Sequence, residues 1–300
     1  MELRQLRSFI KLAEILNFSE ASRELCLTQS TLSQQIRNLE DEFHSQLFIR
    51  NSHSVAITEA GTELLPFARK AVEAAEECHQ RMVDLQDMLV GELNIGVTYS
   101  FSPILTETIF AFMKKYNGVS LNICYKPMAD LMNMLRNRKI DFVLAFKPSE
   151  YAADIESHVL FQNYLAAIVN ASHPLASKEC VSLDELAGYN LALPSKGLQA
   201  RNALDKILDR YPHNLNIRME LNDPHILLDL IRNSNLVTVL AEASVHNQAG
   251  VKAVRISIPE NEMTGCVHTL TGSYHKKSTC EFVKLLCESL AVKERVNAWM

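Results

Sequence analysis

The sequence has no run of apolar residues that approaches the roughly 18 needed for a membrane-spanning helix. Its N-terminus also lacks the basic start, apolar stretch and small-residue cleavage site of a secretory signal. The seven cysteines are scattered over 300 residues without a CxxC pair, which argues against a disulfide framework. These absences together predict a protein of the reducing cytoplasm that does not enter a membrane.

Recognisable catalytic motifs are missing as well. The sequence contains no GxSxG elbow, no P-loop and no HExxH motif, so nothing in it indicates a serine hydrolase, a P-loop nucleotidase or a zinc protease. One scatter of potential metal ligands, Cys266, His268, His275 and Cys280, does not have the spacing of a metal site. We therefore expect no catalytic activity, no metal and no cofactor.

An excess of positive charge, the usual sign of a nucleic-acid-binding surface, is also absent. The formal net charge is −5, and residues 1–57 carry six Lys and Arg against seven Asp and Glu. Each phosphate contact contributes about −0.9 to the slope of log affinity against log salt. If this chain binds DNA, we expect a shallow salt dependence per protomer, with affinity recovered by linking several DNA-binding heads in one oligomer.

Two short helices separated by a tight turn are predicted between Phe18 and Glu40. Thr28 can cap the second helix, in which Leu32, Ile36 and Leu39 form an i, i+4, i+7 stripe. This is the helix-turn-helix pattern, and amide, guanidinium and hydroxyl side chains suit contacts with base edges or phosphates. A merely solvated helix face is the alternative. The predicted DNA contacts on this helix are Thr28, Gln29, Ser30, Thr31, Ser33, Gln34 and Arg37.

A small hairpin follows, because Ile49 to Asn51 and Val55 to Ile57 alternate in polarity around a polar tip. A hairpin at this point forms a wing that flanks the groove, so we add Arg50 and His53 to the predicted DNA contacts. Residues 1–58 are then expected to form a winged helix-turn-helix domain.

A long helix is predicted next, from Thr58 to about Leu89. Its apolar residues alternate steps of four and three, which is the pattern of a coiled-coil seam. Most of them are small, so that a partner helix can approach closely. Residues 59–89 are therefore expected to be a dimerisation helix with the contacts Ala68, Ala71, Ala75, Cys78, Met82, Leu85 and Leu89.

From residue 90 onward, short strands alternate with helices, which predicts a mainly parallel sheet with covered faces. Two such blocks indicate two small α/β lobes. Between the first strand and a helix that starts near Pro103, hydroxyl groups and free backbone N–H groups favour an anionic ligand. Ordinary capping by Ser102 explains the same residues equally well. This loop consists of Thr98, Tyr99, Ser100, Phe101 and Ser102.

These features together resemble the LysR-type transcriptional regulators, and the likeness covers the whole chain. The motifs that carry it are "ASRELCLTQSTLSQQIRNLE", "LFIR" and "ITEAG", with weaker matches in "KIDFVLA" and "HPLA". The resemblance implies an α/β protein with a winged helix-turn-helix N-terminal domain, a long linker helix and a two-lobed periplasmic-binding-protein-like α/β effector domain. Many members have proline at the position of Ser30, arginine at that of Gln34 and arginine at that of His53.

The resemblance also implies two crossovers between the lobes of the effector domain, residues 90–300. Lobe I is expected to comprise about residues 90–162 and 267–300, and lobe II about residues 163–266. A small organic anion is the implied effector, bound in the cleft between the lobes. Beside the loop from Thr98 to Ser102, the implied effector contacts are Met128, Lys147, Pro148, Ser195, Lys196 and Arg201, with Phe101 and Met128 as apolar walls and the lysines and arginine as cations.

The implied partners are double-stranded DNA, at an interrupted palindrome near a promoter, and further copies of the chain in a homodimer or homotetramer. RNA polymerase is a further candidate partner. The effector would control operator binding or DNA bending. The competing hypothesis is a solute-binding protein or small-molecule enzyme with an N-terminal dimerisation appendage, which would keep its function without residues 1–57.

Cysteine-based sensing is the remaining hypothesis, because the peroxide-sensing branch of this family uses a pair of cysteines. The corresponding segment, "LPSKGLQARNALDKIL", contains no cysteine. Cys280 and Cys287 share one helix face at i, i+7, and we expect them to pack in the core rather than to do redox chemistry.

Overall fold

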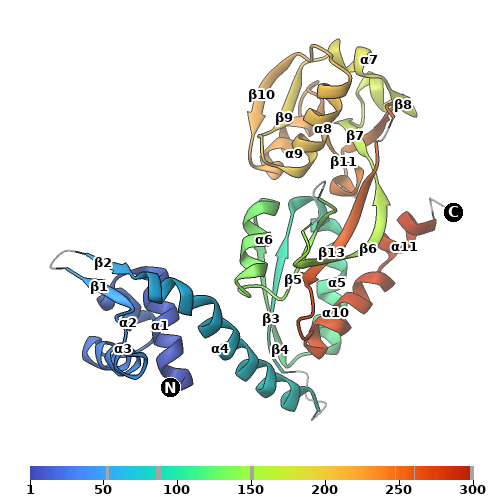
Figure 1. Ribbon diagram of the computed structural model, residues 1–300. Coiled ribbons are helices and arrows are strands. Elements are labelled where there is room, and N and C mark those ends of the chain that lie inside the picture. Colours follow the sequence, from blue (N-terminus) through green and yellow to red (C-terminus); the bar gives the residue numbers. More distant parts are fainter. Residues whose placement is uncertain (52–53, 86–89, 149–151, 247, 260, 298–300) are drawn as a thin grey trace. The chain divides into compact units, whose positions relative to one another are not determined.

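The computed structural model of the chain describes residues 1–51, 54–85, 90–148, 152–246, 248–259 and 261–297. The chain divides into two compact units, Met1–Met88 and Leu89–Met300. Figure 1 shows the elements of both units along the chain. Within the described ranges, no helix combines the length and the apolarity that crossing a membrane requires.

Three helices enclose the core of the first unit: α1 (Leu3–Ile15), α2 (Phe18–Glu24) and α3 (Gln29–Phe43). The Oγ1 atom of Thr28 accepts a hydrogen bond from the backbone N of Thr31 at 3.1 Å, which confirms this residue as the cap of α3. The fully buried side chains come from all three helices and include Phe9, Leu12, Ala21, Leu32, Ile36 and Leu39.

The hairpin consists of β1 (Phe48–Arg50) and β2 (Val55–Ile57), which pair in antiparallel register. The helix α4 (Glu59–Leu85) follows it directly. A Cβ atom at Gly61 would lie 2.5 Å from the carbonyl oxygen of Leu47 and 2.6 Å from Cγ1 of Ile57. Only glycine therefore allows the first turn of α4 to lie this close to the hairpin.

Part of the predicted coiled-coil seam is used inside the chain. Ala68 is only 2% exposed, and Ala71 packs against the same core cluster, which includes residues of α1. This corrects the prediction that Ala68 is free for a partner helix, because α1 already covers it. Further along α4, Ala75 is half-buried, whereas Cys78 and Met82 are exposed. Leu85 ends the helix as described, and Leu89 lies outside the described residues.

The second unit contains two lobes, the first of which is built on a five-stranded sheet in the order β4-β3-β5-β13-β6 (Figure 1). Its strands are β3 (Gly91–Val97), β4 (Val119–Tyr125), β5 (Phe142–Phe146), β6 (Ile155–Asn163) and β13 (Met263–Leu270). The helical elements of this lobe are η1 (Tyr99–Phe101), α5 (Ser102–Lys115), α6 (Met128–Arg136), α10 (Lys277–Glu288) and α11 (Leu290–Asn297).

The second lobe contains a four-stranded sheet in the order β11-β7-β12-β8 and a parallel pair of β9 and β10. Its strands are β7 (Leu165–Asn170), β8 (Cys180–Val181), β9 (Leu191–Pro194), β10 (Ile217–Leu221), β11 (Thr238–Ala241) and β12 (Val251–Ile256). Its helical elements are η2 (Pro174–Ser177), α7 (Leu183–Ala187), α8 (Gln199–Arg210), α9 (Pro224–Arg232) and η3 (Glu242–Val245).

The chain passes between the lobes twice, from β6 into β7 and from β12 into β13. Asn261 ties the two passages together. Its Oδ1 accepts from the backbone N of Leu165 at 2.8 Å, and its Nδ2 donates to the carbonyl oxygens of Leu165 and Ile256 at 2.9 and 2.8 Å. The second passage returns the chain to the first lobe, which therefore includes the C-terminal helices.

Both sheets are mixed, so the prediction of a mainly parallel arrangement is wrong. In the first lobe, β13 runs antiparallel to β5 and β6, and in the second, β7 runs antiparallel to β11 and β12. A parallel pair needs a crossover connection of about a dozen residues or more, usually a helix, between its strands. Only one residue separates β6 from β7, and these strands enter different sheets, so no βαβ unit forms there.

Cys280 and Cys287 are exposed on α10, and the expectation that they pack in the core is therefore wrong. The buried face of this helix is formed by Phe282 and Leu286 together with two small residues, Ser278 and Thr279. The i, i+7 relation places both cysteines on one face, but it is not the face that packs on the lobe.

Candidate DNA-binding surface and effector region

The polar face of α3 lies open to solvent. Leu32, Ile36 and Leu39 on its opposite face are fully buried, at 0% exposure. Burying a leucine or isoleucine side chain stabilises by about 1.5–3 kcal/mol, so the helix cannot rotate to hide its polar face without a large loss. The exposed residues of this face are Thr28, Gln29, Ser30, Thr31, Gln34 and Arg37, while Ser33 is half-buried.

The two glutamines of this face each make one hydrogen bond to a neighbouring side chain. Oε1 of Gln29 accepts from the hydroxyl of Ser19 at 3.3 Å, and Nε2 of Gln34 donates to Oδ1 of Asn38 at 2.6 Å. Within the described part of the chain, Nε2 of Gln29 and Oε1 of Gln34 have no partner. Each glutamine therefore retains hydrogen-bonding capacity for a ligand.

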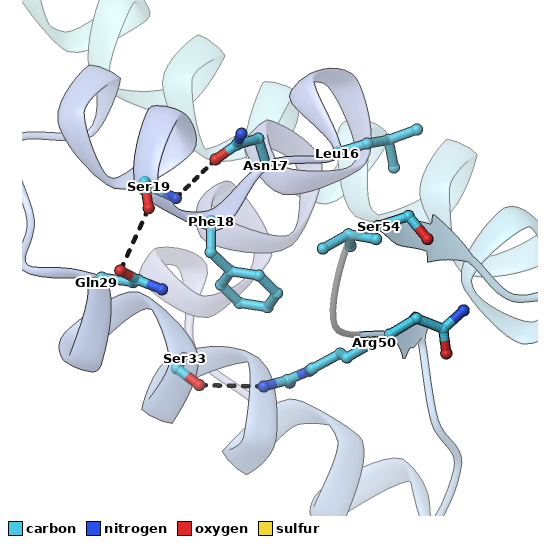
Figure 2. Close-up of a pocket in the computed structure, with 10 residues that line it drawn as sticks. Leu16, Asn17, Phe18, Ser19, Gln29, Ser33, Arg50 and Ser54 are labelled. Atoms are coloured by element: carbon cyan, nitrogen blue, oxygen red, sulfur yellow. Dashed lines mark hydrogen bonds between the residues drawn. The ribbon is translucent and has the colours of Figure 1, made fainter.

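A cleft of about 380 Å³ lies between α3 and the hairpin. Figure 2 shows its walls, which are the junction of α1 and α2 (residues 16–19), Gln29 and Ser33 of α3, and residues at the end of β1 and the start of β2. Several of the wall residues carry hydroxyl or amide groups. The arrangement is that of a polar cleft bounded by α3 on one side and the hairpin on the other.

Arg50, which the sequence places among the DNA contacts, reaches across this cleft to α3 (Figure 2). Its Nη1 donates to the hydroxyl of Ser33 at 3.1 Å, and its Nη2 pairs with Oε2 of Glu40 at 3.1 Å. The guanidinium carbon lies 4.7 Å from the centroid of the Phe18 ring. His53, the other predicted contact on the wing, lies outside the described residues.

The loop after β3 is more enclosed than the sequence predicts. Thr98 and Ser100 are buried at 6% and 8% exposure. Phe101 is fully buried, with its ring 5.1 Å from that of Phe146, so it belongs to the core and does not form a wall of a binding site. Ser102 is the first residue of α5 rather than its cap, since the 3-10 turn η1 precedes the helix.

The predicted cations of the effector region differ in their availability. Lys147 and Lys196 are exposed, and the neighbouring Pro148 and Ser195 are half-buried. The prediction that Arg201 contacts the effector is wrong, because its side chain is only 5% exposed and is already paired within the second lobe. Its guanidinium donates to Asp205, Glu220 and the carbonyl oxygen of Pro194, at 2.7, 2.7 and 3.1 Å.

Gln199, which the sequence did not single out, connects the two lobes. Its Oε1 accepts from the backbone N of Phe146 at 3.2 Å. Its Nε2 donates to the carbonyl oxygen of Phe146 at 3.0 Å and contacts the sulfur of Met128 at 2.9 Å. The side chain therefore pairs with the end of β5 as a neighbouring strand would. Nothing in the surrounding sequence distinguishes this glutamine from an ordinary first-turn residue of α8.

A second contact between the lobes joins Tyr99 of η1 to His225 of α9. Their ring centroids are 4.9 Å apart in an edge-to-face arrangement. Burial raises the pKa of Tyr99 to about 12, so its hydroxyl stays protonated under physiological conditions. Among the residues that the structure describes, no group of three or more His, Cys, Asp or Glu side chains is placed to hold a metal ion.

Comparison with known proteins decides the family. Residues 3–62 match the family model of bacterial regulatory helix-turn-helix proteins of the lysR family, and residues 86–290 match that of the LysR substrate binding domain. The chain belongs to the LysR family. It is a DNA-binding transcriptional regulator with an effector-binding domain, as the relatives of this LysR-family protein are.

The HTH-type transcriptional regulator ShiR of Corynebacterium glutamicum (strain R) is 31% identical to this LysR-family protein, over 77% of this chain and 79% of that one. A full-length OxyR variant from Pseudomonas aeruginosa has the same fold, with a TM-score of 0.71 and 21% identity over 98% of this chain and 95% of that one. The regulatory domain of CcmR from Synechocystis, in complex with 2-PG, matches with a TM-score of 0.59 and 19% identity, over 66% of this chain and 96% of that one.

Proposed function

We propose that this regulator reads its operator by inserting the exposed face of α3 into the major groove of duplex DNA. The observation that carries the proposal is the exposure of the amide, hydroxyl and guanidinium side chains on this face, opposite a fully buried apolar stripe. Gln29 and Gln34 retain groups that suit adenine, and Arg37 suits guanine or a phosphate. Thr28, Ser30, Thr31 and Ser33 are the hydroxyl contacts of the same surface.

The dimer contact that we propose uses the part of α4 that the chain's own core leaves exposed. Cys78 and Met82 belong to the predicted seam, and Phe67 adds a side chain that is 64% exposed. Pairing two such helices would set the distance between two DNA-binding heads, which suits an interrupted palindrome near a promoter. A homotetramer, contact with RNA polymerase, a cytoplasmic location and the absence of catalytic activity complete the proposal.

The effector that we propose is a small organic anion bound between the lobes. Lys147 and Lys196 supply exposed positive charge. Ser195 precedes Lys196 in the loop after β9, while Ser102 begins α5 and Met128 begins α6. Gln199 already pairs with the backbone N–H and C=O of Phe146. A carboxylate on the effector would compete for the N–H, and an amide group for both atoms. The regulatory domain of CcmR, which has a similar fold, is in complex with 2-PG, and this supports a small-molecule effector for the present domain.

The effector proposal is tested by thermal unfolding of the full chain with a panel of small organic acids. A bound ligand at a hundredfold excess over its dissociation constant stabilises by about 2.7 kcal/mol. We expect at least one acid to raise the unfolding temperature, and Lys147→Ala with Lys196→Ala to abolish that rise. A rise that persists in the double variant would contradict the proposed cations.

The DNA-binding proposal is tested by selecting operator duplexes with the full chain and then titrating base-substituted versions of the selected site. If Gln29 contacts one adenine bidentately, Gln29→Ala should lose about 1–3 kcal/mol of discrimination at that position. Equal weakening on every operator version would make Gln29 a phosphate contact instead.

A solute-binding protein or enzyme with an appended dimerisation segment is the competing function. Deleting residues 1–57 separates the two, because the competing function survives this deletion whereas operator binding does not. Retention of specific DNA binding by the truncated chain would overturn the proposal.

A further inference from the structure

The position of Arg50 in the chain suggests a phosphate contact, whereas the position of its guanidinium suggests a contact inside the DNA-binding domain. Arg50 ends β1, directly before the hairpin tip, where a cation is well placed to meet a phosphate. Its guanidinium, however, lies against α2 and α3, in contact with Phe18, Ser33 and Glu40. The side chain is 34% exposed, so about two thirds of its surface is covered by the head itself.

Glu40 anchors this contact. Its Oε1 accepts from the backbone N–H groups of Leu47 and Phe48 at 2.9 and 3.2 Å, while its Oε2 pairs with Nη2 of Arg50 at 3.1 Å. Its side chain is 14% exposed. One carboxylate therefore holds the segment that enters the wing and also holds the arginine that ends the first wing strand.

The guanidinium of Arg50 is engaged on two edges and one face. Nη1 donates to Ser33, Nη2 to Glu40, and the plane is close to the Phe18 ring. Charge-assisted bonds of this kind are strong and directional, and lysine cannot reproduce the fork or the stacking. The neighbouring carboxylate also offsets the positive charge that a phosphate would meet.

We propose that Arg50 is a positioning residue, which fixes the wing on the recognition helix and orients Ser33, and that it does not bind a phosphate. This inference rests on the proposed reading role of α3. Because the Ser33 oxygen accepts from Arg50, its hydroxyl proton is left to donate into the cleft of Figure 2. Ser33 is thereby set to meet an acceptor on the DNA, such as a phosphate oxygen or the N7 atom of a purine.

Two conservative variants of the full chain test the proposal in operator titrations over a range of salt concentrations. Arg50→Lys keeps the charge and removes the fork, and Glu40→Gln keeps an oxygen for the backbone N–H groups and removes the ion pair. We expect each variant to lose affinity by about tenfold, because each loses a charge-assisted contact. The slope of log affinity against log salt should stay at the wild-type value in both, since the neutral Ser33 hydroxyl neutralises no phosphate and neither variant removes a cation that contacts one.

A phosphate-binding Arg50 gives the opposite pattern. Glu40→Gln would then release the guanidinium, tighten binding and steepen the salt slope by about 0.9 per head, while Arg50→Lys would bind much as the wild type does. Either of these results overturns the proposal.

Three further measurements separate positioning from general damage to the head. Arg136→Lys disrupts a comparable fork with Asp154 in the other unit and should bind the operator as the wild type does. In the double variant Arg50→Lys, Ser33→Ala, the loss of binding free energy should be smaller than the sum of the two single losses, because both substitutions remove the same oriented hydroxyl. A loss equal to that sum contradicts the proposal. Loss of base preference in Gln29→Ala with wild-type binding in Arg50→Lys refutes only this inference. Unchanged base preference in Gln29→Ala, Gln34→Ala and Arg37→Ala alike refutes the reading role of α3.

Discussion

Burial changes the chemistry of two single residues in the sheet of the first lobe. His268 on β13 is fully buried, with Nδ1 2.8 Å from the hydroxyl of Ser157 and Nε2 3.2 Å from the carbonyl oxygen of Ala145. A neutral ring that donates from Nε2 and accepts at Nδ1 satisfies both contacts. Burial lowers the pKa of His268 to about 4, so the folded chain favours the neutral form.

The first prediction concerns stability against pH. Between pH 6.5 and about 4, the unfolded chain binds a proton at His268 and the folded chain does not, so this group destabilises the fold as the pH falls. The full effect is about 3 kcal/mol. Urea unfolding of His268→Gln, followed by circular dichroism at pH 7 and pH 5, should show a weaker pH dependence than the wild type. The exposed-site control His79→Gln, on α4, should retain the wild-type dependence; an identical curve for His268→Gln would refute the assignment.

The second prediction concerns thiol reactivity. Burial raises the pKa of the Cys266 thiol to about 11, and the side chain has no solvent exposure. Iodoacetamide at pH 8 should therefore leave Cys266 unmodified in the native chain, because the reactive thiolate is scarce and inaccessible. The exposed Cys26, Cys78 and Cys180 should be labelled. Mass spectrometry of the digested protein measures each site, and rapid labelling of Cys266 would contradict the burial.

At the scale of elements, α4 serves two purposes along its length. Its first half packs on α1 through Ala68 and Val72, while Cys78 and Met82 further along remain exposed. The heptad-like spacing in the sequence indicates that an apolar stripe exists, but it does not say which helix covers it. For Ala68 the partner lies in the same chain, and this could not be deduced from spacing alone.

The third prediction tests the exposed half of that helix. Met82→Glu places a charge in the proposed dimer contact and should shift the protein from dimers or larger assemblies toward monomers in light scattering. Gln80→Glu adds the same charge about 200° around the helix and should leave the mass unchanged. A wild-type mass for Met82→Glu would exclude this face as the dimer contact.

Local sequence patterns predicted the elements well where contacts are local. The cap at Thr28, the buried stripe of Leu32, Ile36 and Leu39, and the exposed glutamines follow from residues within one helix. Contacts between distant segments could not be predicted in this way. The enclosure of Arg50 depends on Phe18 and Glu40, which reach it only because the hairpin folds back onto two helices.

At the scale of the whole molecule, the DNA-binding head lacks surplus positive charge. Four of the six cations in residues 1–57 are paired within the first unit: Arg4, Arg7, Lys11 and Arg50. Arg23 and Arg37 have no ion-pair partner among the described residues. An exposed ion pair contributes little to stability, so its cation can still contact DNA. The neighbouring carboxylate nevertheless reduces the positive charge that a phosphate meets.

The fourth prediction follows from this balance. The salt slope of operator binding should be shallow, on the order of −2 per head, since each phosphate contact contributes about −0.9. Filter-binding or fluorescence titrations between low and moderate salt measure the slope. A slope of roughly −10 per head would show that phosphate contacts dominate and would contradict this account.

The two-lobed architecture was predictable from the alternation of strands and helices together with the family likeness, but the strand directions were not. The crossing strands β6 and β13 are joined to the other lobe rather than to a neighbouring βαβ unit, and sequence periodicity carries no information about that choice. The bridge made by Gln199 depends on the same arrangement, since its partner Phe146 ends a strand of the other lobe.

Major-groove reading by α3 is measured most directly with operator duplexes in which 7-deazaadenine replaces adenine at single positions. This substitution removes the N7 acceptor and changes nothing in the minor groove. We expect the wild type to lose about 1–3 kcal/mol of binding at one or more positions, and Gln29→Ala to bind the altered and unaltered duplexes equally at one of them. Equal wild-type affinity for the normal and altered duplexes at every adenine would contradict adenine reading by Gln29.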